Sequence, residues 1–147
     1  MLKNMLTKET VVVEDTCHTW EDVVFKAGEL LKNTGAIEES YITAMVESIE
    51  KNGPYMVIAP GIALLHARPE DGVNKACMSL YVLKNGVSFG HKDKDPVTLA
   101  FAFGAVDAQS HLQALQQLME LFNDEVRLTK LKNSENVEEA LELVMGG

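Results

Sequence analysis

The chain contains 147 residues, and 22 acidic against 13 basic side chains give it a formal net charge of −9. Apolar residues make up 46% and charged residues 24%, which are ordinary globular proportions that exclude disorder of the bulk of the chain. The acidic balance argues against binding to nucleic acid or to an anionic membrane, and it favours a partner with a basic face.

Cysteine usage and apolar stretches bear on location. Cys17 and Cys77 lie far apart without C-x-x-C spacing, so we expect reduced thiols, at least one of them buried. The first residues, MLKNMLTKET, contain no continuous apolar stretch and are not expected to form a signal peptide. The longest apolar stretches are too short to cross a bilayer, so a cytoplasmic protein without membrane insertion is expected.

The first half of the chain predicts two helices. Thr19 followed by Asp22 resembles a capping box, and apolar residues then continue at helical spacing toward a stop at Gly35. A second helix is expected over residues 38–51, where an apolar stripe ends at Gly53-Pro54.

The middle of the chain shows the short apolar runs that are typical of β-strands. These runs cover residues 55–58, 62–65, 78–83 and 97–106. Pro60-Gly61 predicts a bend between the first two. Asn85-Gly86 is a strong hairpin signal, so we expect the chain to turn there and return through residues 87–89.

Helical patterns return in the C-terminal part. Ser110 and Gln113 form another capping-box pattern, which makes Ser110 the expected cap of a helix that continues to Phe122, and a last helix is expected from about Asn136. Helices and strands are intermixed, and the hairpin adds an antiparallel pair. The chain therefore predicts one domain over residues 1–147, an α/β sandwich with a mixed parallel/antiparallel sheet flanked by helices.

His66 is the most informative of the four histidines because it ends a strand-like apolar run. A histidine at a strand end can be held rigidly while its ring faces a cleft, and the lone pair of a neutral imidazole can act as a nucleophile. The residues alone leave open the alternative, a histidine that is merely hydrogen-bonded at a strand end.

His111 is the second candidate, because a cap at Ser110 would make it the first residue of a helix. Helix N-termini attract anions, so His111 is suited to donate to a phosphate or carboxylate, or it is simply a solvent-exposed residue of the first turn. His18 and His91 are expected to be ordinary surface residues. A metal site made from His66, His91 and His111 would lack ligand-spaced pairs, so no metal is expected.

The segment from Gly53 to Val73, GPYMVIAPGIALLHARPEDGV, resembles the active-site segment of enzyme IIA of the bacterial sugar phosphotransferase system. The likeness is to the mannitol/fructose superfamily (type 2), and within it to the L-ascorbate type. The run HKDKDPVTLAFAFGAVDAQSHLQAL is similar to the same family, so the resemblance covers nearly the whole chain. It implies an α/β sandwich with a mixed sheet.

The resemblance also implies a reaction. His66 falls on the phosphorylated histidine, which attacks through Nε2 while a backbone carbonyl or a carboxylate holds its other ring nitrogen. His111 falls on the second active-site histidine and would stabilise the phosphoryl group, with Arg68 and Ser110 as auxiliary residues. Phospho-HPr donates the phosphoryl group, a cysteine of enzyme IIB accepts it, and enzyme IIC moves the sugar. No cofactor is expected, since the donor is already a phosphohistidine.

Two departures from the family pattern stand near His66. Leu65 precedes it where the motif usually has proline. Ser48 or a neighbour stands where mannitol-type members have an arginine in the second helix, and Arg68 is the candidate replacement. The missing arginine argues for L-ascorbate rather than mannitol or fructose. The alternative function is a regulatory phosphohistidine domain, like nitrogen-type enzyme IIA or an antiterminator module, without a transport role.

Overall fold

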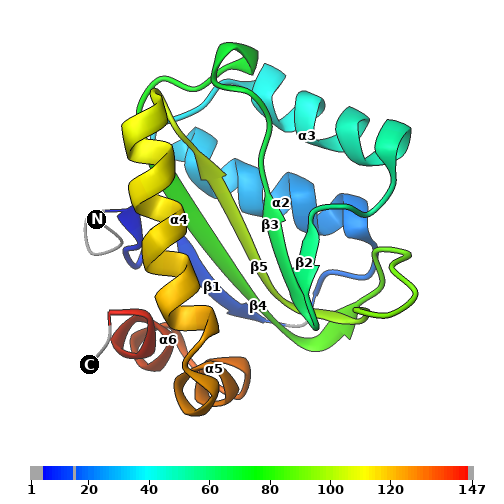
Figure 1. Ribbon diagram of the computed structural model, residues 1–147, viewed down its shortest axis with the longest axis vertical. Helices are drawn as coiled ribbons and strands as arrows, with labels where there is room; N and C mark the ends of the chain where they lie inside the picture. Colours follow the sequence, from blue (N-terminus) through cyan, green and yellow to red (C-terminus); the bar gives the residue numbers. More distant parts are fainter. Residues whose placement is uncertain (1–4, 15, 146–147) are drawn as a thin grey trace.

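The structure is a computed structural model that describes residues 5–14 and 16–145, and it places a five-stranded sheet between two layers of helices (Figure 1). In chain order the elements are β1 (Val11–Glu14), α2 (Trp20–Asn33), α3 (Glu39–Asn52), β2 (Val57–Ala59), β3 (Ile62–Leu65), the 3₁₀ turn η1 (Pro69–Asp71), β4 (Cys77–Val87), β5 (Val97–Gly104), α4 (Ala108–Phe122), α5 (Glu125–Lys132) and α6 (Val137–Val144). The first four residues of the segment assessed above for a signal peptide lie outside the described residues.

The strands lie in the order β1-β4-β5-β3-β2. β1 is parallel to β4 and β3 is parallel to β5, whereas β4 with β5 and β2 with β3 are antiparallel, which confirms the predicted mixed sheet. Leu65 at the end of β3 is in register with Ala102 of β5. The carboxyl ends of β3 and β5 therefore share one edge of the sheet, the upper edge in Figure 1, where η1 lies.

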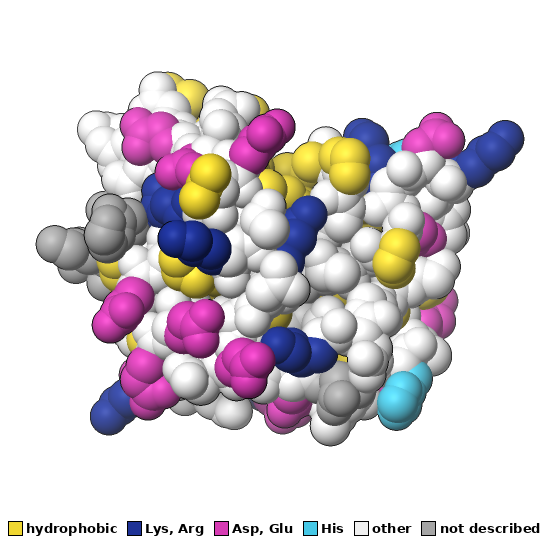
Figure 2. Space-filling model, turned by 90° about the horizontal axis from the view of Figure 1, so that it is seen from below, with side chains coloured by type: hydrophobic (Ala, Val, Ile, Leu, Met, Phe, Trp, Pro, Cys, Tyr) yellow, Lys and Arg dark blue, Asp and Glu magenta, His cyan; other side chains and the backbone are white. Residues whose placement is uncertain are grey.

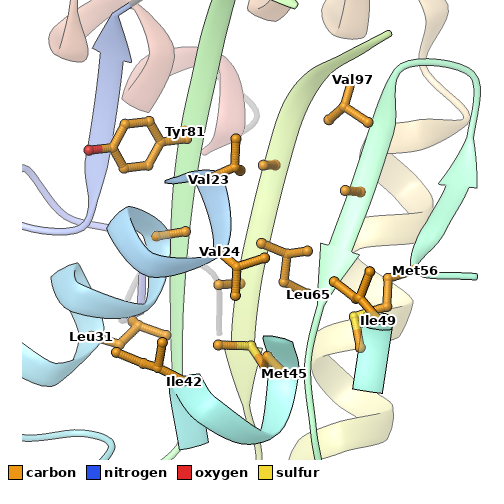
Figure 3. Close-up of a cluster of buried hydrophobic side chains, with 14 of the residues drawn as sticks. Val23, Val24, Leu31, Ile42, Met45, Ile49, Met56, Leu65, Tyr81 and Val97 are labelled. Atoms are coloured by element: carbon orange, nitrogen blue, oxygen red, sulfur yellow. The ribbon is translucent and has the colours of Figure 1, made fainter. Parts of the chain in front are cut away.

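β5 is buried on both faces, as its nearly continuous apolar sequence predicts. Ala100 and Ala102 face the core beneath α2 and α3, while Phe101 and Phe103 face the core beneath α4, α5 and α6. Figure 3 shows the first of these cores, where side chains of α2 and α3 meet the sheet around Leu65. The helices α4, α5 and α6 thus cover β5 on the face opposite to α2 and α3.

The ends of α2 follow the predicted chemistry. Thr19 accepts a hydrogen bond from the Asp22 backbone N–H at 3.2 Å, which confirms the cap. Gly35 has a φ of +81°, and its N–H donates to the Lys32 carbonyl at 2.9 Å, so the left-handed residue after the helix is the glycine that the sequence provides. Local capping residues therefore define this helix.

The predicted hairpin at Asn85-Gly86 is wrong. β4 continues through both residues as far as Val87, which still pairs with Val97 of β5. The register shifts between Val82 and Val87, and Gly86 has a φ of +71°. The dipeptide thus supplies the positive φ of a bulge within a long strand instead of a two-residue turn.

α5 is the helix that the sequence did not predict. Leu131 is its one buried residue among the eight, so the apolar periodicity that identifies a helix is almost absent. Asp124 caps it by accepting from the Arg127 N–H at 3.1 Å, and the Arg127 side chain donates to the carbonyls of Leu143 and Val144. Tertiary contacts with the end of α6 therefore hold this segment in place.

The Asp95 carboxylate holds the loop between β4 and β5 together by hydrogen bonds. It accepts hydrogen bonds from the backbone N–H groups of Phe89, Gly90 and His91 at 2.8–3.0 Å and from the Ser88 hydroxyl at 2.9 Å. Desolvation raises the pKa of Asp95, but these hydrogen bonds together outweigh it and hold the pKa below its ordinary value. The ionised carboxylate is thus the form that stabilises the loop.

Asp95→Asn is expected to lower the free energy of unfolding by about 1–3 kcal/mol at neutral pH, because an amide offers a single acceptor atom to the donors of the loop. A lowered pKa in the folded state means that the contribution is full above the unfolded pKa and is lost as pH falls through the folded pKa. Urea unfolding at several pH values should show the wild-type advantage shrinking as pH falls below about 5. An advantage that does not change with pH would contradict this role.

Charge is spread over the molecular surface. Figure 2, seen from below Figure 1, shows acidic side chains close together over part of that face, with lysine and arginine among them.

Cys17 and Cys77 are both buried and unpaired, in agreement with the expectation of reduced thiols. Among residues 5–14 and 16–145, no helix combines the length and apolar character that a membrane span requires.

Candidate functional site

A surface pocket opens where β3 ends, between α3, η1 and the start of α4. It is lined by Ala44, Glu47, Ser48, Lys51, Asn52, Tyr55, His66, Ala67, Arg68, Pro69, Asp71 and His111. The two histidines singled out in the sequence, 45 positions apart in the printed chain, therefore line the same pocket. The shared carboxyl edge of β3 and β5 brings them together, because α4 follows β5.

His66 follows the last residue of β3, and its half-buried ring is held on several sides. Its Nδ1 lies 3.0 Å from the Leu64 carbonyl oxygen. A carbonyl oxygen can only accept, so this hydrogen bond requires the proton on Nδ1 and leaves the lone pair of a neutral ring on Nε2. Tyr55 stands edge-on to the imidazole with ring centroids 6.4 Å apart, and Phe103 lies 6.0 Å away. The backbone carbonyl thus supplies the partner that the resemblance led us to expect.

Leu65, which stands in place of the usual proline, is fully buried beneath α2 and α3. Figure 3 shows its side chain between residues of α2 and α3. The residue before His66 is therefore anchored by side-chain packing, which restricts the backbone there by a different means from a proline ring.

The expected cap of α4 is corrected: the cap is Asp107, not Ser110. The Asp107 carboxylate accepts from the Ser110 N–H at 2.7 Å, and that hydrogen bond holds the pKa of Asp107 below its ordinary value. His111 is consequently the fourth residue of the helix, and its own N–H already donates to the Asp107 carbonyl at 3.2 Å. The carboxylate offsets the positive end of the helix dipole, so at this end of α4 the imidazole of His111 is the group suited to attract an anion.

Phe103 separates the two histidines. Its ring lies 5.2 Å from that of His111 and 6.0 Å from that of His66, measured between centroids. Phe103 is buried at the end of β5, while His111 is exposed and His66 is half-buried. The two imidazoles therefore both contact the ring of one buried phenylalanine.

Arg68 lies at the rim of the pocket beside η1. Its guanidinium is 3.4 Å from the Asp71 carboxylate, whose other oxygen accepts from the Arg68 backbone N–H at 3.0 Å. The hydrogen bond with Asp71 raises the pKa of Arg68, and its side chain is 74% exposed. Arg68, the predicted auxiliary residue, thus lines the pocket and is paired with Asp71.

Tyr41 on α3 is a positioning residue that the sequence analysis missed. Its hydroxyl accepts from the Ala67 N–H at 2.9 Å and donates to the buried Phe103 carbonyl at 2.8 Å. Burial raises the pKa of Tyr41 to about 12, which keeps the hydroxyl protonated at neutral pH. A tyrosine at helical spacing from Met45 was the available signal, because a buried tyrosine hydroxyl needs a polar partner.

Tyr41→Phe is expected to lower the free energy of unfolding by about 1–3 kcal/mol, because it leaves the Ala67 N–H and the Phe103 carbonyl without their partner. Urea denaturation measures this loss. Tyr55→Phe, which removes a hydroxyl from a half-exposed ring, is the matched control and is expected to change stability little. Equal stability losses in the two variants would contradict the account of Tyr41.

His91 and His18 lie away from the pocket. The half-buried ring of His91 accepts at Nδ1 from the N–H groups of Asp93 and Lys94, both at 3.2 Å, so it closes the β4–β5 connection instead of being an ordinary surface residue. That connection precedes β5, whereas His66 and His111 stand near the other end of the strand. Within residues 5–14 and 16–145, no three His, Cys, Asp or Glu side chains gather in an arrangement that could hold a metal ion.

Comparison with known proteins agrees with this geometry. Residues 4–145 match the model of the family described as phosphoenolpyruvate-dependent sugar phosphotransferase system, EIIA 2. The ascorbate-specific EIIA component of Escherichia coli K12 is 34% identical over 142 residues, which are 96% of this chain and 92% of that protein.

Two solved structures from Escherichia coli share the fold. The mannitol-specific cryptic phosphotransferase enzyme IIA is 34% identical, covers 99% of both chains and superposes with a TM-score of 0.91. The mannitol enzyme IIA, solved in complex with phosphorylated enzyme IIB, is 26% identical, with 97% of this chain and 100% of that chain covered and a TM-score of 0.83. Since the family model covers nearly all residues and both histidines line one pocket, the chain belongs to the type 2 enzyme IIA family of the phosphoenolpyruvate-dependent sugar phosphotransferase system.

Proposed function

We propose that this protein carries a phosphoryl group on Nε2 of His66, which it takes from phospho-HPr and passes to the cysteine of an enzyme IIB. The observation that carries the proposal is the hydrogen bond from Nδ1 of His66 to the Leu64 carbonyl, because it directs the free lone pair to Nε2. The family membership supports the same role.

The two transfers balance without a cofactor. In the first, the N–P bond of phospho-HPr breaks while an N–P bond forms at Nε2 of His66. In the second, that bond breaks while an S–P bond forms on the acceptor thiolate. Nδ1 keeps its proton throughout, since the Leu64 carbonyl holds it. Phosphoryl transfer of this kind depends on positioning and on stabilising charge at the three equatorial oxygens, for which His111 and Arg68 are the groups at hand.

The acidic net charge of the chain suits the proposed phosphoryl donor. A net charge of −9 favours a donor with a basic rim around its histidine, and this is the expectation for HPr. With these partners, the protein is expected to act in the cytoplasm. Enzyme IIC acts after enzyme IIB and does not take part in the two transfers at His66.

Incubation with phosphoenolpyruvate, enzyme I and HPr tests the proposal. The intact protein is expected to gain the mass of one phosphoryl group, and digestion should map it to His66. Omission of HPr is the control and should leave the mass unchanged. A protein that stays unmodified with all components present would overturn the phosphocarrier role.

L-ascorbate is the proposed sugar of the pathway that this carrier serves. The GPY, APG and HARPE pattern and the absence of an arginine at Ser48 or its neighbours support it, as does the similarity to an ascorbate-specific relative. A mannitol-named structure is equally similar at 34% identity, so overall identity does not select the sugar.

Transfer to purified enzymes IIB separates these sugars. The phosphorylated protein is expected to pass its phosphoryl group faster to the ascorbate-type enzyme IIB than to the mannitol or fructose types. Loss of label from the carrier, followed over time with each acceptor, measures the three rates. Faster transfer to a mannitol or fructose acceptor would reverse the assignment.

A further inference from the structure

Tyr55, the third residue of the GPY segment, has no part in the function described so far. It lies just before β2 with half of its surface exposed, and its ring stands edge-on to the imidazole of His66 at an interplanar angle of 84°. Its hydroxyl is 2.8 Å from the hydroxyl of Ser48 on α3. Both residues line the pocket with His66, so a fixed pair of hydroxyl groups stands on its α3 wall.

The two hydroxyls have more hydrogen-bonding capacity than their mutual contact uses. Each carries one hydrogen, and the bond between Ser48 and Tyr55 consumes only one of the two. The other hydrogen is free for an acceptor in the pocket. A phosphoryl group on Nε2 of His66 would bring three oxygens that need donors, and charge-assisted hydrogen bonds to such oxygens are stronger than neutral ones.

Two other hydrogen-bond donors of the pocket come from different elements than the Ser48 and Tyr55 hydroxyls. Arg68 approaches from the η1 side and is paired with Asp71, and His111 approaches from α4. Lys51 and Glu47 lie on α3 and also line the pocket. Tyr55 is the residue on this wall whose ring contacts the imidazole itself.

We propose that Tyr55 is a further phosphoryl-contacting residue and that Ser48 positions it. Ser48 donates its hydrogen to the Tyr55 oxygen, and the Tyr55 hydroxyl donates its own hydrogen to an oxygen of the phosphoryl group on Nε2 of His66. The tyrosine proton is not transferred in this step. The inference rests on the proposed function, because it requires a phosphoryl group on His66.

Tyr55→Phe tests the contact, since it keeps the ring beside His66 and removes only the hydroxyl. At saturating phospho-HPr, single-turnover phosphorylation is expected to be about 10- to 100-fold slower, with the apparent KM for phospho-HPr unchanged. Thermal unfolding should stay close to that of the wild type. Tyr81→Phe, at a buried tyrosine of β4 outside the pocket lining, is the matched control and should react at the wild-type rate.

Ser48 variants test the order of the pair. Ser48→Ala is expected to slow the reaction by a smaller factor than Tyr55→Phe, and Ser48→Thr, which keeps a hydroxyl, should restore most of the rate. The double variant Ser48→Ala/Tyr55→Phe should be phosphorylated at the same rate as Tyr55→Phe alone, because Ser48 acts through Tyr55. Additive losses would overturn the assigned order.

The outcomes distinguish the two proposals. A wild-type protein that phospho-HPr does not label would overturn the proposed function. A labelled wild type together with a Tyr55→Phe variant that reacts at the same rate would overturn only the role of Tyr55. A raised KM with an unchanged saturating rate would also overturn it, because that result assigns Tyr55 to partner docking.

Discussion

His66→Ala is expected to abolish phosphorylation of the protein by phospho-HPr. The variant removes Nε2, the proposed nucleophile, and no other histidine of the described residues has both a place in the pocket and a ring nitrogen bonded to a backbone carbonyl. The lost hydrogen bond to Leu64 is a single neutral contact at a strand end, so the stability loss should be about 1 kcal/mol and the fold should persist. Intact-protein mass after incubation with phosphoenolpyruvate, enzyme I and HPr is the measurement.

His18→Ala is the matched control for this experiment. His18 is exposed before α2 and is not part of the pocket lining, so the variant should gain one phosphoryl group as the wild type does. Circular dichroism and thermal unfolding should show that both variants are folded. A folded His66→Ala protein that still accepts the phosphoryl group would refute the assignment of the nucleophile.

His111→Ala is expected to slow transfer by about a hundred- to a thousandfold, while His66 remains the labelled residue. Removing one donor from a developing anion costs roughly 3–4 kcal/mol in the transition state. The effect must come through the imidazole, because the backbone N–H of His111 donates to Asp107 within the helix in any variant. Rapid-quench measurement of phosphoryl exchange with HPr gives the rate, and titration calorimetry gives the affinity for HPr.

The affinity for HPr should change far less than the rate, because binding is spread over a surface and His111 is one exposed residue of it. Gln109→Ala, another exposed position in the first turn of α4, is the control and should exchange at the wild-type rate. Wild-type exchange in His111→Ala, or a phosphoryl group mapped to His111 in the unmodified protein, would contradict the proposed role.

The Asp107 carboxylate changes the electrostatics at the start of α4. An N-terminal turn of α4 without Asp107 would offer free N–H groups to an anion in the pocket. The carboxylate takes the Ser110 N–H and remains ionised at neutral pH, since its pKa is lowered. Helix position alone therefore did not establish the charge near His111.

Local signals in the sequence determined the parts of this protein whose causes are local. The Thr19 side chain caps the start of α2, and Gly35 follows its end with a positive φ. Residues 62–65 form β3 where the apolar run predicts a strand. His66 directly follows that strand and lines the pocket, as expected for a histidine at a strand end whose ring faces a cleft. The resemblance of residues 53–73 to an active-site segment added the expected chemistry.

Only the tertiary structure decided which competing local signals prevail. Asp107 and Ser110 are both good caps, and in the folded chain the helix starts at the earlier one. Asn85-Gly86 suits a turn, yet β4 continues past it to Val87, which pairs with Val97 of β5. α5 forms although its periodicity is weak, because Arg127 binds the end of α6.

The supports of His66 likewise come from residues distant in sequence. Tyr41 reaches Ala67 and Phe103 across 26 and 62 positions, Ser48 meets Tyr55 through the turn between α3 and β2, and Phe103 separates two histidines that no spacing rule connects. Hydrogen bonds and ring contacts of this kind depend on how helices and strands are placed in space, and periodicity along one chain records only which face of an element is buried. The sequence by itself thus predicted β3 and the candidate histidine that follows it, and the packing of α3, β5 and α4 around that strand decided which side chains surround His66.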